Sequence, residues 1–524
     1  MRGEPEWDAL IVGAGVSGGW AAMILTEAGL RVLVLDAGPD ITPDRVWWRS
    51  DPRTAERPPG AGQDVQSRHG AVNAANRHLF VDDAKHPYHS GPDRRFTWIR
   101  GRQIGGRSLT WGAVTLRMSD HELLAARDDG HGESWPFGHD ELARYYDRAE
   151  AFMRVHGAAD GLPQLPGGSY AAPFPLTDGE HALRAALERR WPERRLIPGR
   201  GIPERPAGWD LPYPAYSTQA TTLRAALRTG RLAIRSQTIA ARIEIDPASA
   251  RVLGVVCVDA TTGRRELVPA GRALVLAAST VETTRLLFNS ACPAFPDGLG
   301  NRSGALGKHL MDHPLVAIRG HAPGLSRDSL PPFVGPQGFL IPRFRNLGRR
   351  DTDYLRGFLI AGAVQRDVRG APPDECPFML AAIGEMLPDP SNRIVPRPDL
   401  VDAWGIPSVA IECAYGDNER RMMDDALACM REIAEAAGLE PRGDVMRLEP
   451  GAFVHEVGTA RMGARPESSV LNPRLQCWDV PDLFVVDGAC FPSSGCQNPS
   501  LTMMALAARA SEFVLAHVKA GRRA

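Results

Sequence analysis

The first forty residues carry the pattern that most limits what this chain can fold into. An apolar run of strand length, 9–12, follows Asp8 and enters the turn Gly13-Ala-Gly15-Val16-Ser17-Gly18, and an Ala-rich segment of helical length follows. A second apolar run, 32–35, follows Arg31 and ends at Asp36. A strand, a Gly-x-Gly-x-x-Gly turn, a helix and a second strand ending in an acid are typical of the βαβ unit that binds dinucleotides. The sequence therefore predicts an α/β fold with a Rossmann-like, doubly wound cofactor-binding domain.

Each glycine of this turn has its own expected role. Gly13 allows the tight turn, Gly15 lets the backbone approach a pyrophosphate, and Gly18 lets the helix pack closely against the strand. The phosphates would lie at the helix N-terminus, where unpaired N–H groups favour an anion. Asp36 is expected to accept hydrogen bonds from the adenosine ribose. A turn with a purely structural role is the alternative interpretation.

Length and composition indicate an ordinary globular protein with more than one domain. A chain of 524 residues is longer than one hydrophobic core usually supports. A net charge of −1 argues against a nucleic-acid or anionic-membrane partner, because both select for a basic excess. We see no leader and no apolar segment long enough to span a bilayer, so we expect a cytoplasmic protein. The eight cysteines include no Cys-x-x-Cys pair and are expected to be reduced thiols.

The middle of the chain alternates between loops, helices and strands. The turn Gly105-Gly106-Arg107-Ser108 would let backbone amides approach a planar or anionic ligand, although a plain glycine loop fits equally well. Alternating β-branched residues over 232–267 predict a small antiparallel meander. The run 272–280 predicts a buried strand that returns to the nucleotide sheet and leads into a helix. A long helix is expected from Gly416 to Ala437.

The last seventy residues carry a second dense group of glycine and polar residues. His455 lies in Val-His-Glu-Val-Gly, Asp487-Gly488 follows an apolar strand, and Asn498-Pro499-Ser500 precedes an apolar helix. Taken alone, Asn498 could be a helix N-cap and His455 a satisfied polar residue.

One further histidine pair suggests a metal site. His309 and His313 are spaced as in zinc-binding helices, with Asp312 between them. Because Pro314 would end a helix there and no third ligand is apparent, we expect no metal.

Together these stretches resemble the glucose-methanol-choline (GMC) family of FAD-dependent oxidoreductases over most of the chain. His455-Glu-Val-Gly458, Cys477-Trp478 and Gln497-Asn498-Pro499 are similar to the branch that includes pyranose oxidase, gluconate dehydrogenase and glucoside 3-dehydrogenase. The resemblance implies FAD contacts at Gly13, Gly15, Val16, Ser17, Gly18, Asp36, Gly105, Gly106, Arg107, Ser108, Trp111, Gly112, Ala113, Ala278, Asp487, Gly488, Asn498, Pro499 and Ser500.

The same resemblance implies a catalytic pair, His455 and Asn498. His455 would take the hydroxyl proton of the substrate while its carbinol hydrogen leaves as hydride to the flavin, and Asn498 would orient the substrate oxygen. In fungal pyranose oxidases a His before the loop's Trp is linked covalently to the flavin. Here that residue is Thr110, so FAD is expected to be held non-covalently.

The resemblance and the strand pattern predict two interleaved domains. The FAD-binding domain would comprise 1–155, 232–314 and 450–524, with a covering loop over about 39–95. The substrate domain would comprise 156–231 and 315–449 and contain a mixed or antiparallel sheet.

Three functions stay open from the sequence. The first is oxidation of a sugar or glycoside hydroxyl to a ketone, with C3 as the candidate carbon and oxygen or another acceptor taking the electrons. No haem subunit or membrane partner is evident. The second keeps the chemistry on an alcohol of a natural product, and the third is a non-catalytic flavoprotein.

Overall fold

A parallel sheet forms the first half of the architecture. The computed structural model describes residues 6–46, 62–69, 72, 75–328, 330–332, 335–368 and 375–521. Within the sheet the Ala277 N–H donates to the Val12 carbonyl oxygen (2.8 Å), which joins two paired sets of strands. The spatial order is β4 (Leu232–Arg235), β2 (Val32–Leu35), β1 (Ala9–Val12), β8 (Ala273–Leu276) and β17 (Leu483–Val485). The predicted α/β fold and the return of the 272–280 run to the nucleotide sheet are confirmed.

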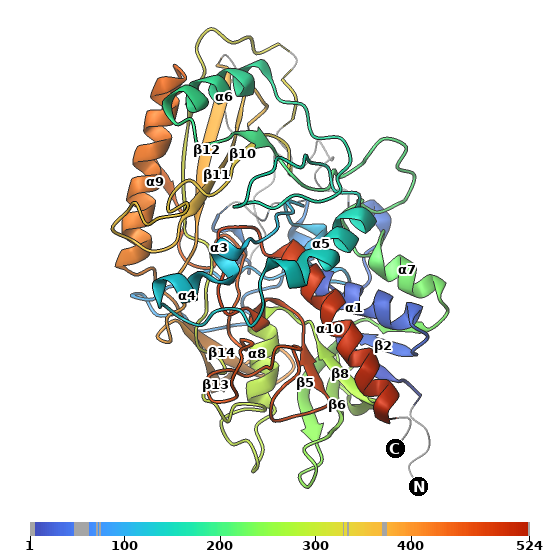
Figure 1. The fold of residues 1–524 in the computed structure, drawn as a ribbon. Helices are drawn as coiled ribbons and strands as arrows, with labels where there is room; N and C mark the ends of the chain where they lie inside the picture. The colour runs from blue at the N-terminus through green and yellow to red at the C-terminus, as the bar shows by residue number, and fades with distance from the viewer. Residues whose placement is uncertain are drawn as a thin grey trace.

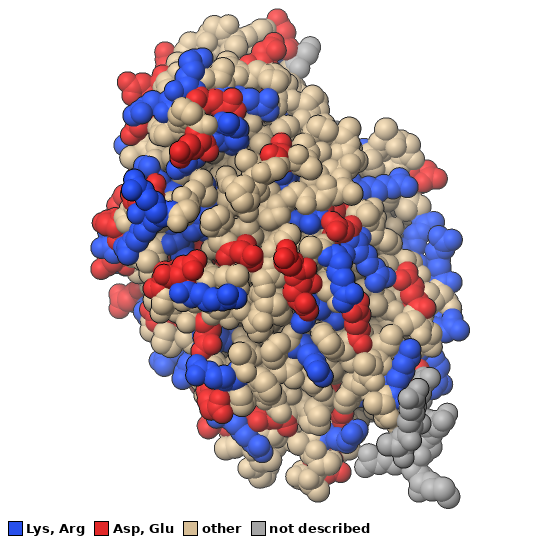
Figure 2. Space-filling model, viewed as in Figure 1, with Lys and Arg blue, Asp and Glu red and all other residues tan. Residues whose placement is uncertain are grey.

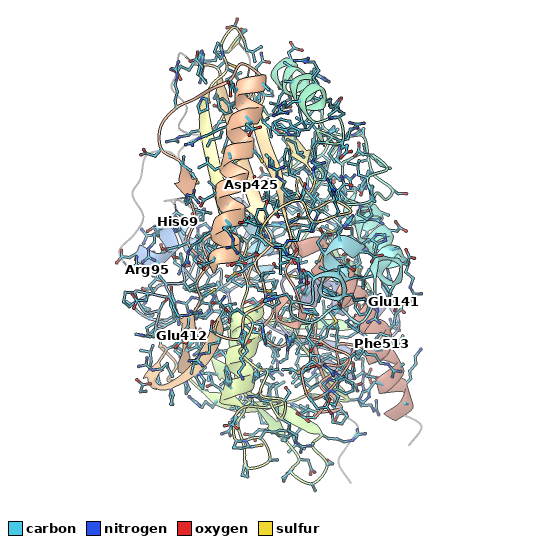
Figure 3. The ribbon with its side chains drawn as sticks, turned by 60° about the vertical axis from the view of Figure 1, so that its left-hand side comes forward. His69, Arg95, Glu141, Glu412, Asp425 and Phe513 are labelled. Carbon is cyan, nitrogen blue, oxygen red and sulfur yellow. The ribbon has the colours of Figure 1, made fainter. Side chains whose placement is uncertain are left out.

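Helices gather around this sheet (Figure 1). Helix α1 begins directly after the glycine turn and packs against the last helix of the described chain, α10. The helices of this half are α1 (Val16–Glu27), α7 (Thr222–Arg228), α8 (Thr280–Asn289), α10 (Ser500–Gly521) and α5 (His139–Met153), which packs on α10. Arg509 of α10 donates to Glu141 of α5 (3.1 Å) and lies over the ring of Phe513. Glu141 and Phe513 are labelled in Figure 3.

Helix α10 corrects one expectation. By length and composition alone it could cross a membrane, so the statement that no apolar segment is long enough was wrong. Because 67% of its most apolar window is buried inside the protein, this is weak evidence for a membrane span. A core helix passes the same test.

An antiparallel sheet forms the second half. Its strands, in spatial order, are β15 (Glu440–Pro441), β9 (Leu315–His321), β12 (Pro377–Gly384), β11 (Phe358–Val364), β10 (Phe339–Ile341) and β3 (Ile197–Pro198), with β16 (Met446–Arg447) also on β9. Helix α9 (Asp417–Ala436), predicted at 416–437, lies along one face of this sheet, and α6 (Asp178–Arg190) lies beside it (Figures 1 and 3). Side chains alternate across the pleat of β12: Phe378, Leu380 and Ala382 join the core under α9, and the residues between them face the other way.

The predicted meander is confirmed only in part. β5 (Thr238–Ile245), β6 (Val252–Asp259) and β7 (Arg265–Pro269) form it, whereas 232–235 is β4 of the parallel sheet. The remaining elements are the hairpin β13 (Arg393–Val401) and β14 (Pro407–Glu412), the short helices α2 (Asp64–Ser67), α3 (Asp120–Leu123) and α4 (Ala125–Asp129), and 3₁₀ turns at Pro43–Arg45, Arg77–Leu79, Gly106–Leu109 and Gly488–Cys490.

The surface in Figure 2 carries interspersed basic and acidic side chains rather than a field of one sign. Part of the predicted covering loop, including 47–61, lies outside the described residues. The domain boundaries stay a prediction.

Candidate active site

A cavity of about 750 Å³ lies between the carboxyl ends of the parallel strands and the inner face of the antiparallel sheet. Open α/β sheets bind ligands at this edge. Of the residues predicted to form the site, the following line it: Gly13, Gly15, Val16, Ser17, Asp36, Gly106, Arg107, Ser108, Thr110, Trp111, Gly112, Ala113, Ala278, His455, Asp487, Gly488, Asn498, Pro499 and Ser500.

The two remaining predicted residues, Gly18 and Gly105, shape the backbone behind the cavity. A Cβ on Gly18 would overlap the carbonyl oxygen of Gly13, so helix α1 could not pack so close to the strand with any other residue. Gly105 has φ +90° and begins the turn that carries Arg107.

The first turn of α1 offers an anion site. Gly15 is its N-cap and no side chain caps the helix, so its first N–H groups lack an intrahelical partner. A Cβ built on Gly15 would meet no protein atom within 4 Å, because the cavity lies there. Asp36 accepts hydrogen bonds from the N–H groups of Ala14 and Gly38, both 2.8 Å, and burial raises its pKa to about 6.

Four charged residues surround the same end of the cavity. Arg100, Arg102, Glu282 and Arg285 all line it. Burial raises the pKa of Glu282, but Arg285, Arg102 and Arg100 outweigh burial and hold this pKa at about 2. The spacing of these residues in the sequence does not show that they lie together, because α8 and the loop before Gly105 meet only in the fold.

Arg107 and Glu456 form a second buried polar group. Arg107 Nη1 donates to Glu456 Oε2 (2.7 Å) and to the Val454 carbonyl oxygen (2.9 Å), which ties the glycine loop to the His455 loop. Glu456 Oε1 is buried without a hydrogen-bond partner, and Glu456 lines the cavity. A buried acceptor in this position is suited to a ligand hydroxyl or N–H.

His455 and Asn498 come together as predicted. Asn498 Nδ2 lies 3.3 Å from His455 Nε2, and both residues line the cavity. The ring of Phe453 lies against His455, with 4.4 Å between centroids. Burial, then His313 and Arg107, lower the pKa of His455 well below its ordinary value, so the ring is neutral at pH 7.

His455 has a second partner, His313, which the sequence analysis considered only as a metal ligand and rejected. His313 Nδ1 lies 2.9 Å from His455 Nδ1. Asp312, which precedes it, accepts hydrogen bonds from the backbone N–H groups of Gly451 (2.7 Å) and His455 (3.0 Å). Within the described ranges, no group of three or more His, Cys, Asp or Glu residues could hold a metal ion.

The wall opposite the nucleotide turn is apolar. Every residue that the antiparallel sheet gives to the cavity has an apolar side chain or none: Leu315, Phe339, Leu340, Ala361, Gly362, Met379, Ala381 and Ile383. Gln337, just before β10, and Arg200, just after β3, are the polar lining residues nearest in sequence to these strands.

Comparisons with known proteins identify the family. Two family models of the GMC oxidoreductases match this chain, the N-terminal model over residues 215–315 and the C-terminal model over 388–507. The chain belongs to the GMC oxidoreductase family. It is therefore an FAD-dependent oxidoreductase that acts on alcohol or sugar CH–OH groups.

Several relatives match along their whole length. A 2-methyl-1,2-propanediol dehydrogenase of Mycolicibacterium austroafricanum is 28% identical over 97% of this chain and 95% of its own. A fructose dehydrogenase large subunit of Gluconobacter japonicus is 27% identical over 98% of both chains. A C-glycoside 3-oxidase of Arthrobacter globiformis is 25% identical over 97% of this chain and 94% of its own.

Solved structures show the same fold at lower identity. A pyridoxine 4-oxidase from Mesorbium loti superposes with a TM-score of 0.64 at 19% identity, covering 97% of this chain and 99% of its own. A formate oxidase variant from Aspergillus oryzae gives a TM-score of 0.67 at 16% identity, covering 100% and 99%.

The residues present fit FAD. The open space beside Gly15, the uncapped start of α1, the carboxylate of Asp36 and the unpartnered Glu456 Oε1 are the groups that a dinucleotide with a polar ring system requires. These residues would hold the phosphates, the ribose and the polar edge of the cofactor.

Proposed function

We propose that the chain oxidises a CH–OH group with His455 as general base and Asn498 as the residue that orients the substrate oxygen. The observation that carries this proposal is the position of His455 Nε2, which lies beside Asn498 Nδ2 at the cavity surface. When bound, FAD supplies the acceptor for the carbinol hydrogen. Thr110 stands where a covalent link would need a histidine, which supports non-covalent binding.

His455 is suited to its task because it is neutral. A neutral imidazole nitrogen can take the hydroxyl proton as soon as the substrate oxygen reaches it, with no prior loss of its own proton. The Asn498 amide can donate to the same oxygen and fix which C–H points toward the cofactor. Phe453 excludes water from one side of the base.

The substrate we propose has an apolar portion beside its reacting hydroxyl. The wall formed by Leu340, Met379, Ala381 and Ile383 offers no hydrogen-bonding side chain. A free sugar would need a hydrogen-bond partner in the site for each hydroxyl that is removed from water. This observation favours an alcohol of a natural product. The similarity to a 2-methyl-1,2-propanediol dehydrogenase also supports a non-sugar alcohol.

A sugar or glycoside, oxidised at C3, is the second candidate. It is supported by the similarity to C-glycoside 3-oxidase and to fructose dehydrogenase large subunit. A glycoside with an apolar aglycone fits the wall better than a free sugar, because the aglycone could cover Met379 and Ile383.

Anaerobic reduction of the purified holoenzyme distinguishes these candidates. D-Glucose, phenyl β-D-glucopyranoside and cyclohexanol are mixed separately with the enzyme, and bleaching of flavin absorbance is followed. We expect bleaching by cyclohexanol or the phenyl glucoside and little by glucose. Fast bleaching by glucose alone would refute the apolar portion. Recovery of absorbance on admitting air then separates oxygen from another electron acceptor.

The His455→Ala variant tests the catalytic assignment. We expect FAD to stay bound and bleaching to slow by about 10²-fold or more, the usual contribution of a general base. Unchanged bleaching would remove His455 from the reaction, and a wild-type enzyme that no alcohol or sugar bleaches would favour a non-catalytic flavoprotein. A cytoplasmic location and action without a haem subunit or membrane partner also stay predictions.

A further inference from the structure

Asp312 and His313 contact the loop that carries His455, the proposed base. Asp312 is fully buried, and its carboxylate accepts hydrogen bonds from the backbone N–H groups of Gly451, Phe453 and His455. His313 is 1% exposed and reaches the ring of His455. The first residue of the pair therefore fixes the backbone of the loop, and the second contacts the side chain.

The backbone beside His313 indicates which nitrogen of its ring carries the proton. The ring of His313 is also hydrogen-bonded to the backbone at Ser494 and Gly495, in the sense that raises its pKa. A backbone group that favours the protonated ring is a carbonyl oxygen, which can only accept. Because His313 Nδ1 faces His455, the nitrogen that donates to these carbonyls is Nε2.

A neutral imidazole carries one proton, so His313 Nδ1 must then be an acceptor. Burial lowers the pKa of His313 to about 4, which keeps this ring neutral at pH 7. The proton between the two rings consequently belongs to His455 Nδ1. His455 is neutral as well, and its Nε2 is left with a lone pair.

The contact between Asn498 and His455, at the other end of this row of hydrogen bonds, fits the same assignment. Asn498 Nδ2, an amide nitrogen, can only donate, and it lies 3.3 Å from His455 Nε2. Donors and acceptors thus run in one direction, from Asn498 through His455 and His313 to the backbone at Ser494 and Gly495.

We propose that His313 is a positioning residue that holds His455 as the Nδ1–H tautomer. This tautomer keeps on Nε2 the lone pair that takes the proton of the substrate hydroxyl once the substrate oxygen replaces Asn498 Nδ2 beside it. The inference rests on the proposed role of His455. It also gives His313 a role other than metal binding, because His313 acts on the ring of His455. Among the described residues, no interaction joins His309 to His455.

Nitrogen NMR tests the tautomer without turnover. The holoenzyme is labelled with ¹⁵N-histidine, and the His455 signals are assigned by their loss in His455→Asn. We expect a pyridine-type shift for Nε2 and a pyrrole-type shift for Nδ1 at neutral pH. A pyrrole-type Nε2 in the wild type would overturn the proposal. In His313→Leu we expect the two tautomers to mix.

Flavin reduction tests the consequence. The probe is whichever of cyclohexanol, phenyl β-D-glucopyranoside and D-glucose reduces the wild-type flavin. His313→Leu removes the acceptor at similar volume and should lower the limiting reduction rate by about 10²-fold, with a substrate dissociation constant changed by less than about 3-fold. His313→Asn, which can place an amide oxygen where Nδ1 lies, should recover most of that loss. His309→Asn is the control and should leave the rate unchanged.

The outcomes separate this inference from the proposed function. If His455→Asn leaves the reduction rate unchanged, the base assignment fails, while the NMR of the wild type still decides the tautomer. If His455→Asn abolishes reduction but His313→Leu, with FAD bound, stays within about 3-fold of wild type, the positioning role of His313 is wrong. If His313→Leu does not fold, the Asn variant and the wild-type spectrum decide.

Discussion

Replacing Asp312 by asparagine should change how the stability of the protein depends on pH. Burial, reinforced by Glu456, raises the pKa of Asp312 to about 7 from an ordinary 3.8, against the opposing effect of the backbone N–H groups of His313, His455 and Gly451. An acid whose pKa is raised on folding stabilises the protein fully below the unfolded pKa. This contribution is lost as the pH rises through the folded pKa.

The size of the loss follows from the shift. Between the two pKa values the wild type loses about 1.4 kcal/mol of unfolding free energy per pH unit. From about pH 5 to about pH 8 this slope applies over roughly two pH units, because it ends near the folded pKa. The wild type therefore loses about 2.5 kcal/mol over this range. Asparagine does not titrate and is nearly isosteric with the protonated acid. The unfolding free energy of the wild type, relative to Asp312→Asn, should therefore fall by that amount over this range.

Urea unfolding followed by tryptophan fluorescence at several pH values measures this difference, provided that refolding reproduces the curves. Asp425→Asn is the matched control. The pKa of Asp425, which accepts from Arg345 and Tyr354 and is labelled in Figure 3, is lowered by these partners in spite of burial. Its contribution is complete above pH 5, so the control should show a constant deficit. Parallel curves for wild type and Asp312→Asn would refute the reasoning.

Three further variants or treatments test other parts of the structure. Gly15→Ala should leave the melting temperature of the apoprotein unchanged, because the new methyl meets no protein atom. The same variant should bind FAD more weakly in a fluorescence titration. Equal affinity would exclude a close approach of the cofactor to Gly15. Acid precipitation should leave a colourless pellet and free FAD in the supernatant, since Thr110 cannot form a covalent link; a yellow pellet would show one. Arg117→Met should cost about 3–5 kcal/mol in urea unfolding, because it strands the buried carboxylate of Glu150; a loss below about 1 kcal/mol would contradict this.

The nucleotide-binding half could be predicted because its signals are local. The strand before Gly13, the glycine turn and the acid at Asp36 lie within thirty residues, and each has a steric reason that does not depend on the rest of the fold. The apolar run 273–276 is recognisable in the same way, since parallel strands are buried on both faces.

Strand pairing was less predictable. The alternating residues 232–235 fit a meander by pattern, yet they extend the parallel sheet beside β2, because α7 brings them there. Similarly, the two-residue strand β3 joins β10 across more than a hundred residues, a choice made by tertiary packing and not by local propensity.

The site was predictable where a resemblance marked it and not elsewhere. His455 and Asn498 were found through their motifs, whereas the contact of His313 with His455 depends on how β9 and the 451–455 loop meet. The available signal was His313 itself, a histidine followed by Pro314 and an apolar strand. Its spacing from His309 raised only the question of a metal site, which the sequence argued against.

The packing of α1 against α10 has a consequence for how the molecule is made. α1 leaves the ribosome long before α10, so α1 has no neighbour on that side until the residues between the two helices have been synthesised. β1 likewise waits for β8, and β8 for β17. Contacts of such long sequence separation form slowly, and apolar surface on the nascent N-terminal segment stays exposed meanwhile. Production of this protein should accordingly depend on chaperone supply and on slow, cool expression more than on the stability of the finished fold.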